Sequence, residues 1–226
     1  MGNVRQKTVS PWRLWLLVIL AAMYWSLLIP HGLLGVPFFW MQMVFADLTL
    51  VMLALANHTG MRRDAVEWLR RSTWSACMKQ LLLGACIAAL LWGVFWIGDR
   101  LSSLLFDFAR PQVELIYGLK NTGRMGPGAV SLLLLLCIGP AEEWFWRGFV
   151  QRSLGEVWGK PFPAFVVTAV LYALIHVCSL NFMLVMAALV AGLVWGFLYW
   201  LKPSWLPALV VSHALWDAAV FVWFPI

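Results

Sequence analysis

Three short motifs in the second half of the chain combine residue types that can activate water. They are Glu142-Glu143-Trp-Phe-Trp-Arg147, Tyr172-x-x-x-His176 and His213-x-x-x-Asp217. A carboxylate and a neutral imidazole that face one pocket can remove a proton from water. A second carboxylate near an imidazole can fix its orientation or tautomer. The motifs therefore supply the groups of an acid–base site.

Helical spacing divides these residues into separate roles. Glu143 and Arg147 are four residues apart with the acid first, the favoured order for an ion pair on a helix. Glu142 is rotated by about 100° from Glu143 on the same helix, so it can point elsewhere. We therefore expect Glu143 to pair with Arg147, and Glu142 to remain available to meet His176. His213 and Asp217 have the same spacing of four, so we expect these two side chains to contact each other.

The composition indicates the solvent in which these groups must meet. The chain has 226 residues, of which 63% are hydrophobic and only 12% are charged, and its mean hydropathy is +0.84. A soluble domain has about a quarter charged residues, and a disordered chain is far less apolar. The sequence therefore predicts a polytopic membrane domain. The net charge of +6 does not indicate a nucleic-acid partner, because the basic residues lie in short loops between apolar runs.

Apolar runs long enough to cross a bilayer predict an all-α bundle of about seven spans. The predicted spans are 14–30, 36–56, 81–98, 129–154, 161–178, 182–200 and 205–224. The charged stretch 57–79 predicts a helix along the membrane surface, and a second interfacial helix is expected near 101–108. No internal repeat divides the chain, so we treat it as one integral membrane domain. Its parts are 1–128, with N-terminal helices and interfacial segments, and 129–226, the catalytic helix core.

The distribution of basic residues predicts the orientation. Of the 16 Lys and Arg residues, only Arg100, Arg110, Lys120 and Arg124 fall on one side, which leaves 12 on the side of the N-terminus. The positive-inside rule then places the N-terminus in the cytoplasm, and the short chain suggests the inner membrane of a prokaryotic cell. Tryptophans near span ends, Trp25 among them, are expected in interfacial belts. His31 and His58 flank spans, so we expect them at the interface as well.

Depth arithmetic places the chemical groups at one level of the membrane. At 1.5 Å per residue, Glu142 lies roughly 18 Å, His176 about 22 Å, His213 about 12 Å and Asp217 about 18 Å from the inner face. The hydrocarbon core is about 30 Å thick, so all four lie inside it, where ionisable groups are costly and usually functional. Asp47, in the second span, has no partner at fixed spacing. It could serve either a helix-packing hydrogen bond or the site.

Taken together, the motifs resemble those of the CPBP intramembrane proteases, which include CAAX prenyl endopeptidases of the Rce1 type and the bacterial Abi proteins. The hallmark is Glu-Glu-x-x-x-Arg, then an aromatic residue four positions before His, then His-x-x-x-Asn or Asp. The resemblance covers about residues 129–220. Two positions depart from the common pattern: Tyr172 stands where Phe is usual, and Asp217 stands where Asn is frequent.

The resemblance implies hydrolysis of a peptide bond in a membrane-associated peptide or protein, such as a prenylated CAAX-type segment. The implied roles are water activation by Glu142 with His176, oxyanion stabilisation by His213 with Asp217, and structural support by Glu143 with Arg147. The implied partners are the lipid bilayer and the peptide substrate, with no nucleic acid. Neither the substrate nor the oligomeric state follows from the sequence.

Metal use and two other functions remain open at this stage. The residue types also allow zinc, with Glu142, His176 and His213 as candidate ligands. We favour no cofactor, because no HExxH ligand pair is present. One alternative is a proton-coupled transporter, although neither an inverted repeat nor paired broken helices are evident. The other is a catalytically silent immunity or scaffold protein of the same fold, against which the intact motifs argue.

Overall fold

The computed structural model describes residues 9–28, 39–118 and 125–226, and all regular structure in these ranges is helical. Within them, six helical segments are long and apolar enough to cross a membrane. These segments are Phe39–Asn57, Trp74–Leu105, Pro127–Trp158, Pro161–Ser179, Phe182–Leu201 and Pro203–Trp223. The helix α1 (Pro11–Leu28) is apolar but slightly shorter than a typical span. The prediction of an all-α polytopic bundle with about seven spans is confirmed.

Several of the spans contain more than one helical segment. In chain order after α1 they are α2 (Phe39–Asn57), α3 (Thr59–Arg71), α4 (Trp74–Leu105), α5 (Ala109–Gly118), α6 (Pro127–Leu133), η2 (Leu134–Ile138), α7 (Gly139–Glu143), η3 (Trp144–Gln151), α8 (Arg152–Trp158), α9 (Pro161–Leu174), η4 (Val177–Ser179), α10 (Phe182–Leu201), η5 (Pro203–Trp205), α11 (Leu206–Ala218) and η6 (Ala219–Trp223). The segments η2, η3 and η6 are π-helical, a wide turn often found at functional sites.

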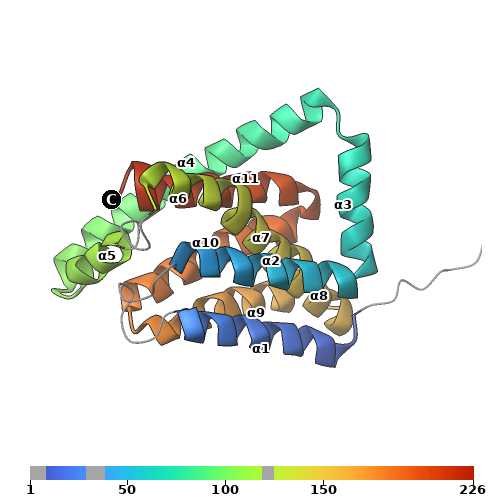
Figure 1. Cartoon of the computed structure of the whole chain (residues 1–226), viewed down its shortest axis with the longest axis horizontal. Coiled ribbons are helices and arrows are strands. Elements are labelled where there is room, and N and C mark those ends of the chain that lie inside the picture. Colours follow the sequence, from blue (N-terminus) through green and yellow to red (C-terminus); the bar gives the residue numbers. More distant parts are fainter. Residues whose placement is uncertain (1–8, 29–38, 119–124) are drawn as a thin grey trace, which may run out of the picture.

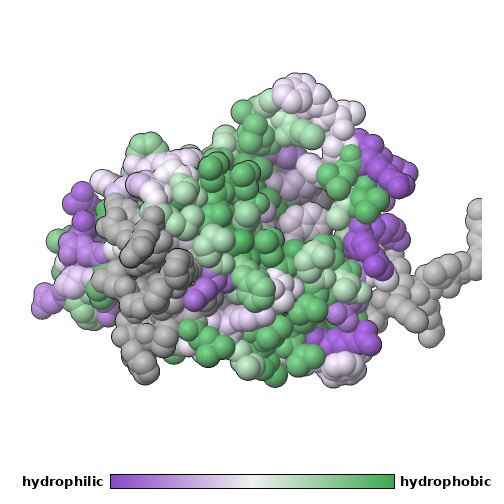
Figure 2. All heavy atoms as spheres, viewed as in Figure 1, coloured by the Kyte–Doolittle hydropathy of each residue, from purple (hydrophilic) through white to green (hydrophobic). Residues whose placement is uncertain are grey.

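The long helices run roughly side by side, and α3 crosses one end of the bundle to join α2 to α4 (Figure 1). The helix α11 packs along α4 and against α7, while α10 packs along α9. Figure 2 shows a hydrophobic band across the middle of one face, with hydrophilic residues gathered toward its two ends. This distribution is typical of a multi-pass membrane protein, because the apolar band matches the hydrocarbon and the charged ends match the headgroups.

The structure corrects the predicted boundaries around the third long span. We expected a span at 81–98 and a separate interfacial helix near 101–108, but α4 continues without a break from Trp74 to Leu105. The next helix, α5, begins only at Ala109. The charged pair Asp99-Arg100 ends the apolar run without ending the helix, because a charged helix can continue beyond the hydrocarbon. At 1.5 Å per residue, the 32 residues of α4 extend about 48 Å, well over the thickness of the core.

The expected surface helix at 57–79 is present in shortened form. It is α3, which ends at Arg71, after which the hydroxyl of Thr73 caps the start of α4. His58 lies between α2 and α3, as expected of a residue that flanks a span, and its side chain is buried; its position at the membrane interface stays a prediction. Its Nδ1 accepts a hydrogen bond from the Met61 N–H at the start of α3, and its Nε2 lies 3.3 Å from Glu156. His31 and the first basic residues of the chain lie outside the described residues.

Candidate active site

The Glu-Glu motif lies on one α-helical turn, α7, between two π-helical segments. At the end of the first segment, the Gly139 N–H bonds to the carbonyl of Leu134, five residues back. Pro140 follows directly and has no N–H to donate, so the widened turn accommodates a residue that breaks regular α-helical bonding. The site therefore stands where the helix of this span departs from regular geometry.

A close contact between α7 and α11 brings the first and third motifs together. A Cβ atom placed on Gly139 would lie 2.7 Å from the Cα and 2.8 Å from the backbone nitrogen of Ala214. Such distances are too short for any side chain, so only glycine allows the two backbones to touch here. Ala214 follows His213 directly, and Gly139 precedes Glu143 by one helical turn. This backbone contact therefore places His213 beside the two glutamates.

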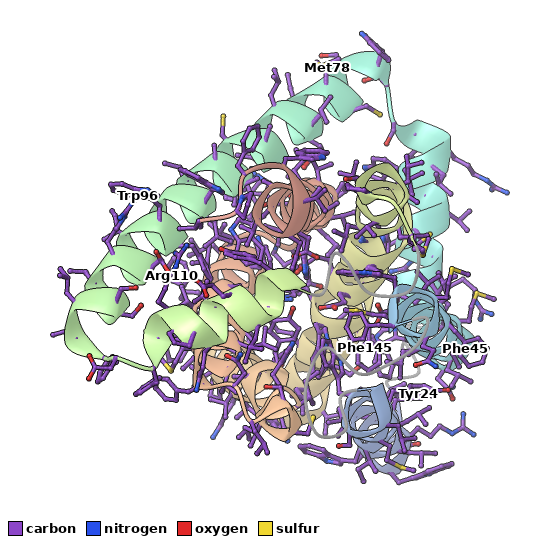
Figure 3. The ribbon with its side chains drawn as sticks, turned by 60° about the vertical axis from the view of Figure 1, so that its left-hand side comes forward. Tyr24, Phe45, Met78, Trp96, Arg110 and Phe145 are labelled. Atoms are coloured by element: carbon purple, nitrogen blue, oxygen red, sulfur yellow. The ribbon has the colours of Figure 1, made fainter. Side chains whose placement is uncertain are left out.

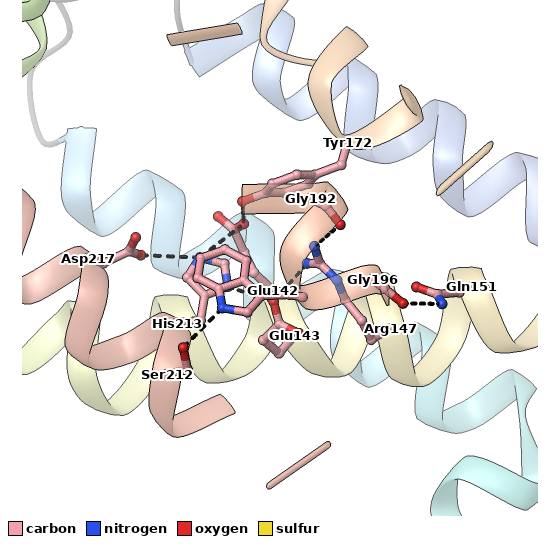
Figure 4. Close-up of polar contacts among 11 residues, drawn as sticks. Glu142, Glu143, Arg147, Gln151, Tyr172, Gly192, Gly196, Ser212, His213 and Asp217 are labelled. Atoms are coloured by element: carbon pink, nitrogen blue, oxygen red, sulfur yellow. Dashed lines mark hydrogen bonds and ion pairs between the residues drawn. The ribbon is translucent and has the colours of Figure 1, made fainter. Parts of the chain in front are cut away.

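Glu143 is the centre of a buried polar network (Figure 4). Its Oε1 accepts a hydrogen bond from Arg147 Nη1 at 2.7 Å, and the exposed fractions of the two side chains are 0% and 1%. The predicted ion pair is confirmed. The same Oε1 lies 2.9 Å from Nδ1 of His213, a contact that the sequence did not predict. Glu143 therefore joins the Glu-Glu motif to the third motif, in addition to pairing with Arg147.

The same helical face continues from Glu143 through Arg147 to Gln151 and reaches α10. Arg147 Nη2 donates to the carbonyl of Gly192 at 3.3 Å, and Gln151 Nε2 donates to the carbonyl of Gly196 at 2.9 Å. These contacts fix the span of the glutamates against α10. Gln151 was not among the predicted site residues, since a glutamine four residues after Arg147 does not by itself indicate a catalytic or supporting role.

Glu142 points away from that network, toward the second motif. The Tyr172 hydroxyl donates to Glu142 Oε2 at 2.7 Å. His176 Nδ1 lies 2.7 Å from the carbonyl of Tyr172 and therefore donates to it, which leaves Nε2 as the acceptor of a neutral ring. Both Glu142 and His176 line one cavity, together with Tyr172. Among the described residues no hydrogen bond or ion pair joins these two side chains, so the expected contact between them stays a prediction, and what they share is the cavity.

The third motif has the contact that its spacing predicts. Asp217 Oδ2 lies 3.4 Å from Nε2 of His213, and the same Nε2 is 3.8 Å from Glu142 Oε2. His213 therefore has carboxylates on both of its ring nitrogens. Asp47 is buried within electrostatic reach of Glu142 and Asp217, and its Oδ2 has no hydrogen-bond partner among the described residues. Asp47 does not line the cavity of the motifs, so both possibilities for this residue stay open.

Two tryptophans support the histidines, and the sequence predicted neither contact. Trp195 stacks on the ring of His213, with centroids 4.0 Å apart and an interplanar angle of 20°. The Arg147 guanidinium also lies near this indole, 5.4 Å from a ring centroid. Trp25, expected in an interfacial belt, is instead buried, and its ring lies 4.2 Å from that of His176. Aromatic rings thus limit the movement of both imidazoles.

The cavity has a volume of about 540 Å³ and is lined mostly by apolar side chains. Glu142, Tyr172, His176, His213 and Asp217 line it from one side. We tested whether these groups fit a metal ion. Among the described residues, no three His, Cys, Asp or Glu side chains are grouped so that they could share one. The arrangement of donors therefore does not match the three-ligand zinc site that the residue types allowed.

Comparison with known protein families agrees with this geometry. Residues 125–219 match the family described as Rce1-like, Type II CAAX prenyl endopeptidase Rce1-like. Residues 125–219 are therefore similar to the Rce1-like family. The matched range contains all three motifs and agrees closely with the range of the resemblance in the sequence. No curated protein and no solved structure matches the chain. This similarity and the apolar helices of the described residues agree with a multi-pass membrane protein.

Proposed function

We propose that this Rce1-like protein hydrolyses a peptide bond in a membrane-associated peptide or protein, with Glu142 as the general base. The observation that supports this most directly is the meeting of three separate spans at one cavity. Glu142, His176 and His213 come from these three spans and line the same space, buried in an otherwise apolar bundle. Ionisable side chains are costly to bury inside membrane spans, and those that occur there usually have a function.

In the proposed first step, Glu142 takes a proton from a water molecule in the cavity. The Tyr172 hydroxyl holds Oε2 of Glu142, so Oε1 is available to accept that proton. The neutral His176 ring presents Nε2 as a second acceptor for the same water, since its Nδ1 is bonded to a backbone carbonyl. The hydroxide then attacks the carbonyl carbon of the peptide, and the carbonyl oxygen becomes an oxyanion.

In the same proposal, His213 stabilises that oxyanion. Its Nδ1 faces Glu143, so a ring protonated on both nitrogens donates there and presents Nε2–H to the cavity. Asp217, 3.4 Å from Nε2, supplies compensating negative charge to the imidazolium, whereas Glu142, 3.8 Å from Nε2, is neutral at this stage because it carries the proton taken from water. A prepositioned donor at a developing oxyanion typically contributes a factor of about 10²–10³ to the rate.

The cycle closes when the tetrahedral intermediate collapses. The C–N bond breaks, the carbonyl re-forms as a carboxylic acid, and the proton on Glu142 moves to the leaving amine. One water is consumed, and two peptides are released. Every proton is carried by side chains of this chain, and no step passes through a metal ion. Glu143, Arg147 and Trp195 act in this proposal by holding His213 and Glu142 in place.

The apolar lining of the cavity favours a hydrophobic substrate, in keeping with a lipidated or strongly apolar segment of the CAAX kind. We also propose that the N-terminus lies in the cytoplasm, on the basis of the Lys and Arg distribution. A topology reporter fused within α3, near Arg70, tests this orientation. Reporter activity only on the outer side would contradict it.

A cleavage assay tests the proposed function. The purified protein in detergent is incubated with a library of apolar and farnesylated peptides, and products are identified by mass spectrometry. We expect cleavage by the wild type and by Glu67→Gln, a control in which an exposed glutamate of α3 is changed. We expect none by Glu142→Gln. Equal cleavage by Glu142→Gln, or a wild-type protein that cleaves no member of the library, would contradict the proposal.

A further inference from the structure

The catalytic cavity extends beyond the motifs toward α4 and α5. On that side its walls are the apolar chains Val94, Phe95, Phe106, Val113 and Ile116, together with the polar residues Asp99 and Tyr117. Ile226 lines the same cavity. A peptide that places its scissile bond at Glu142 therefore has further room in this direction.

Residues 224–226 of the chain lie on this side, and side chains of α4 and α5 hold their main chain. Trp92 Nε1 donates to the carbonyl of Phe224 at 3.1 Å, and Arg110 Nη1 donates to the main-chain oxygen of Ile226 at 3.1 Å. The N–H of Ile226 donates to the Tyr117 hydroxyl at 2.9 Å. The side chain of Phe224 is 63% exposed, so it is not inserted in a pocket. The three hydrogen bonds are therefore made to main-chain atoms of residues 224 and 226, and they depend little on which side chains these residues carry.

Arg110 is itself held in place, and Tyr117 keeps its proton. Figure 3 shows Arg110 where α5 approaches α4, and its guanidinium lies 3.3 Å from Asp99 Oδ2 and 3.3 Å from Glu114 Oε1. Burial is the main reason that the pKa of Tyr117 is raised above its ordinary value, so its hydroxyl stays neutral at physiological pH. A neutral phenol can accept the peptide N–H while keeping its own proton.

We propose that Trp92, Arg110 and Tyr117 form a main-chain subsite for the peptide substrate, which residues 224–226 occupy in the structure. The ligand class is an extended apolar peptide recognised through its backbone N–H and C=O groups. The proposal deepens the proposed function and rests on it, since Tyr117 and Ile226 line the cavity that contains Glu142. A consequence is that the substrate must displace residues 224–226, which lowers its apparent affinity by the fraction of time that they occupy the subsite.

Displacement can be measured without any cleavage. A cysteine is introduced by Ile226→Cys in a chain whose four native cysteines are replaced by alanine. Its rate of reaction with a maleimide is followed in detergent. The probe is acetyl-Val-Trp-Phe-Pro-Ile-amide, which has the sequence of residues 222–226. We expect saturating probe to raise the labelling rate at position 226 at least fivefold. Labelling at Leu104→Cys, an exposed position of α4 whose side chain does not line the cavity, should not change.

A second probe tests recognition of the backbone itself. Methylation of the nitrogen of its isoleucine removes the N–H that Tyr117 would accept, and leaves every side chain unchanged. Loss of one such hydrogen bond typically weakens binding about fivefold, so the methylated probe should need about five times the concentration. In Tyr117→Phe, the two probes should be equally effective, because the acceptor is gone.

Two results would overturn the subsite. One is a labelling rate at position 226 that does not respond to the probe. The other is equal potency of both probes when Tyr117 is intact. Because the readout is labelling, displacement by the probe in a protein that cleaves no peptide would leave the subsite standing and contradict only the proposed function.

Discussion

Removal of Arg147 should destabilise the protein far more than removal of a matching arginine on its surface. Arg147 and Glu143 form an ion pair of 2.7 Å at a spacing of four residues, and both side chains are buried. Arg71 and Glu67 on α3 form a pair with the same spacing and the same distance, but their exposed fractions are 79% and 47%. The two pairs thus differ mainly in burial, which makes Arg71→Ala a control for Arg147→Ala.

The expected magnitudes follow from what each substitution leaves behind. Arg147→Ala leaves the Glu143 carboxylate without its cation in a buried network, and breaking one side of a buried pair typically costs about 3–5 kcal/mol. It also removes the hydrogen bond to the carbonyl of Gly192 and the guanidinium beside Trp195. Arg71→Ala leaves Glu67 in water, and exposed pairs contribute at most about 1 kcal/mol.

Thermal unfolding in detergent, followed by loss of the monodisperse peak in size-exclusion chromatography, measures the difference. At roughly 2–4 °C per kcal/mol for a chain of this size, Arg147→Ala should lower Tm by about 6–20 °C, and Arg71→Ala by less than about 4 °C. The double variant Glu143→Gln with Arg147→Met should recover part of the loss, because no charge is left unpaired. If Arg147→Ala is as stable as Arg71→Ala and yet inactive, Arg147 takes part in the chemistry and its assignment as support is wrong.

Three further predictions concern the geometry and chemistry of the site. Gly139→Ala should force α7 away from α11, lower stability by about 1–3 kcal/mol and abolish activity, whereas Gly128→Ala, with nothing within 4 Å of the added carbon, should behave as wild type in the same assays. Tyr172→Phe removes one hydrogen bond to a carboxylate, which corresponds to about 1.5–3 kcal/mol. It should therefore lower kcat at least tenfold with unchanged folding; an unchanged kcat would mean that Glu142 does not need this bond. Protein stripped of metal by a chelator should keep its full cleavage rate with Glu142 as base. One stoichiometric zinc, lost together with activity, would show a metal-dependent reaction instead.

The sequence predicted contacts within a single helix because the helical period determines them. The Glu143–Arg147 and His213–Asp217 contacts follow from a spacing of four residues, and both occur in the structure. Depth arithmetic also brought Glu142 to the level of the other groups. That level depends only on the helix rise and on where each span begins.

Contacts between helices were beyond the reach of that reasoning. The bond between Glu143 and His213 depends on the close approach of the Gly139 backbone to Ala214. A single glycine in an apolar run does not by itself indicate that two helices approach so closely. Trp195 is one of 16 tryptophans, and nothing in its spacing separates a ring that stacks on a histidine from one in an interfacial belt. Tertiary packing decides both.

The errors at the ends of helices have a common physical origin. The span prediction followed hydropathy, so it stopped at Asp99 although α4 continues to Leu105. For His58, hydropathy predicted only that it flanks an apolar run. Its role in the start of α3 and its contact with Glu156 arise from the fold. Hydropathy reports where a segment meets lipid, whereas hydrogen bonding determines where a helix ends.

The central claim is that Glu142 deprotonates a water molecule that then attacks a peptide bond in this cavity. Incorporation of an oxygen isotope from water tests this claim most directly. A peptide cleaved by the wild type is incubated with excess enzyme in ¹⁸O-labelled water for a single turnover, and both products are analysed by mass spectrometry. We predict that wild-type protein places one ¹⁸O in the new carboxylate of the N-terminal product, and that Glu142→Gln, folded to the same Tm, gives no product. Labelled product formed by Glu142→Gln at the wild-type rate would contradict the account.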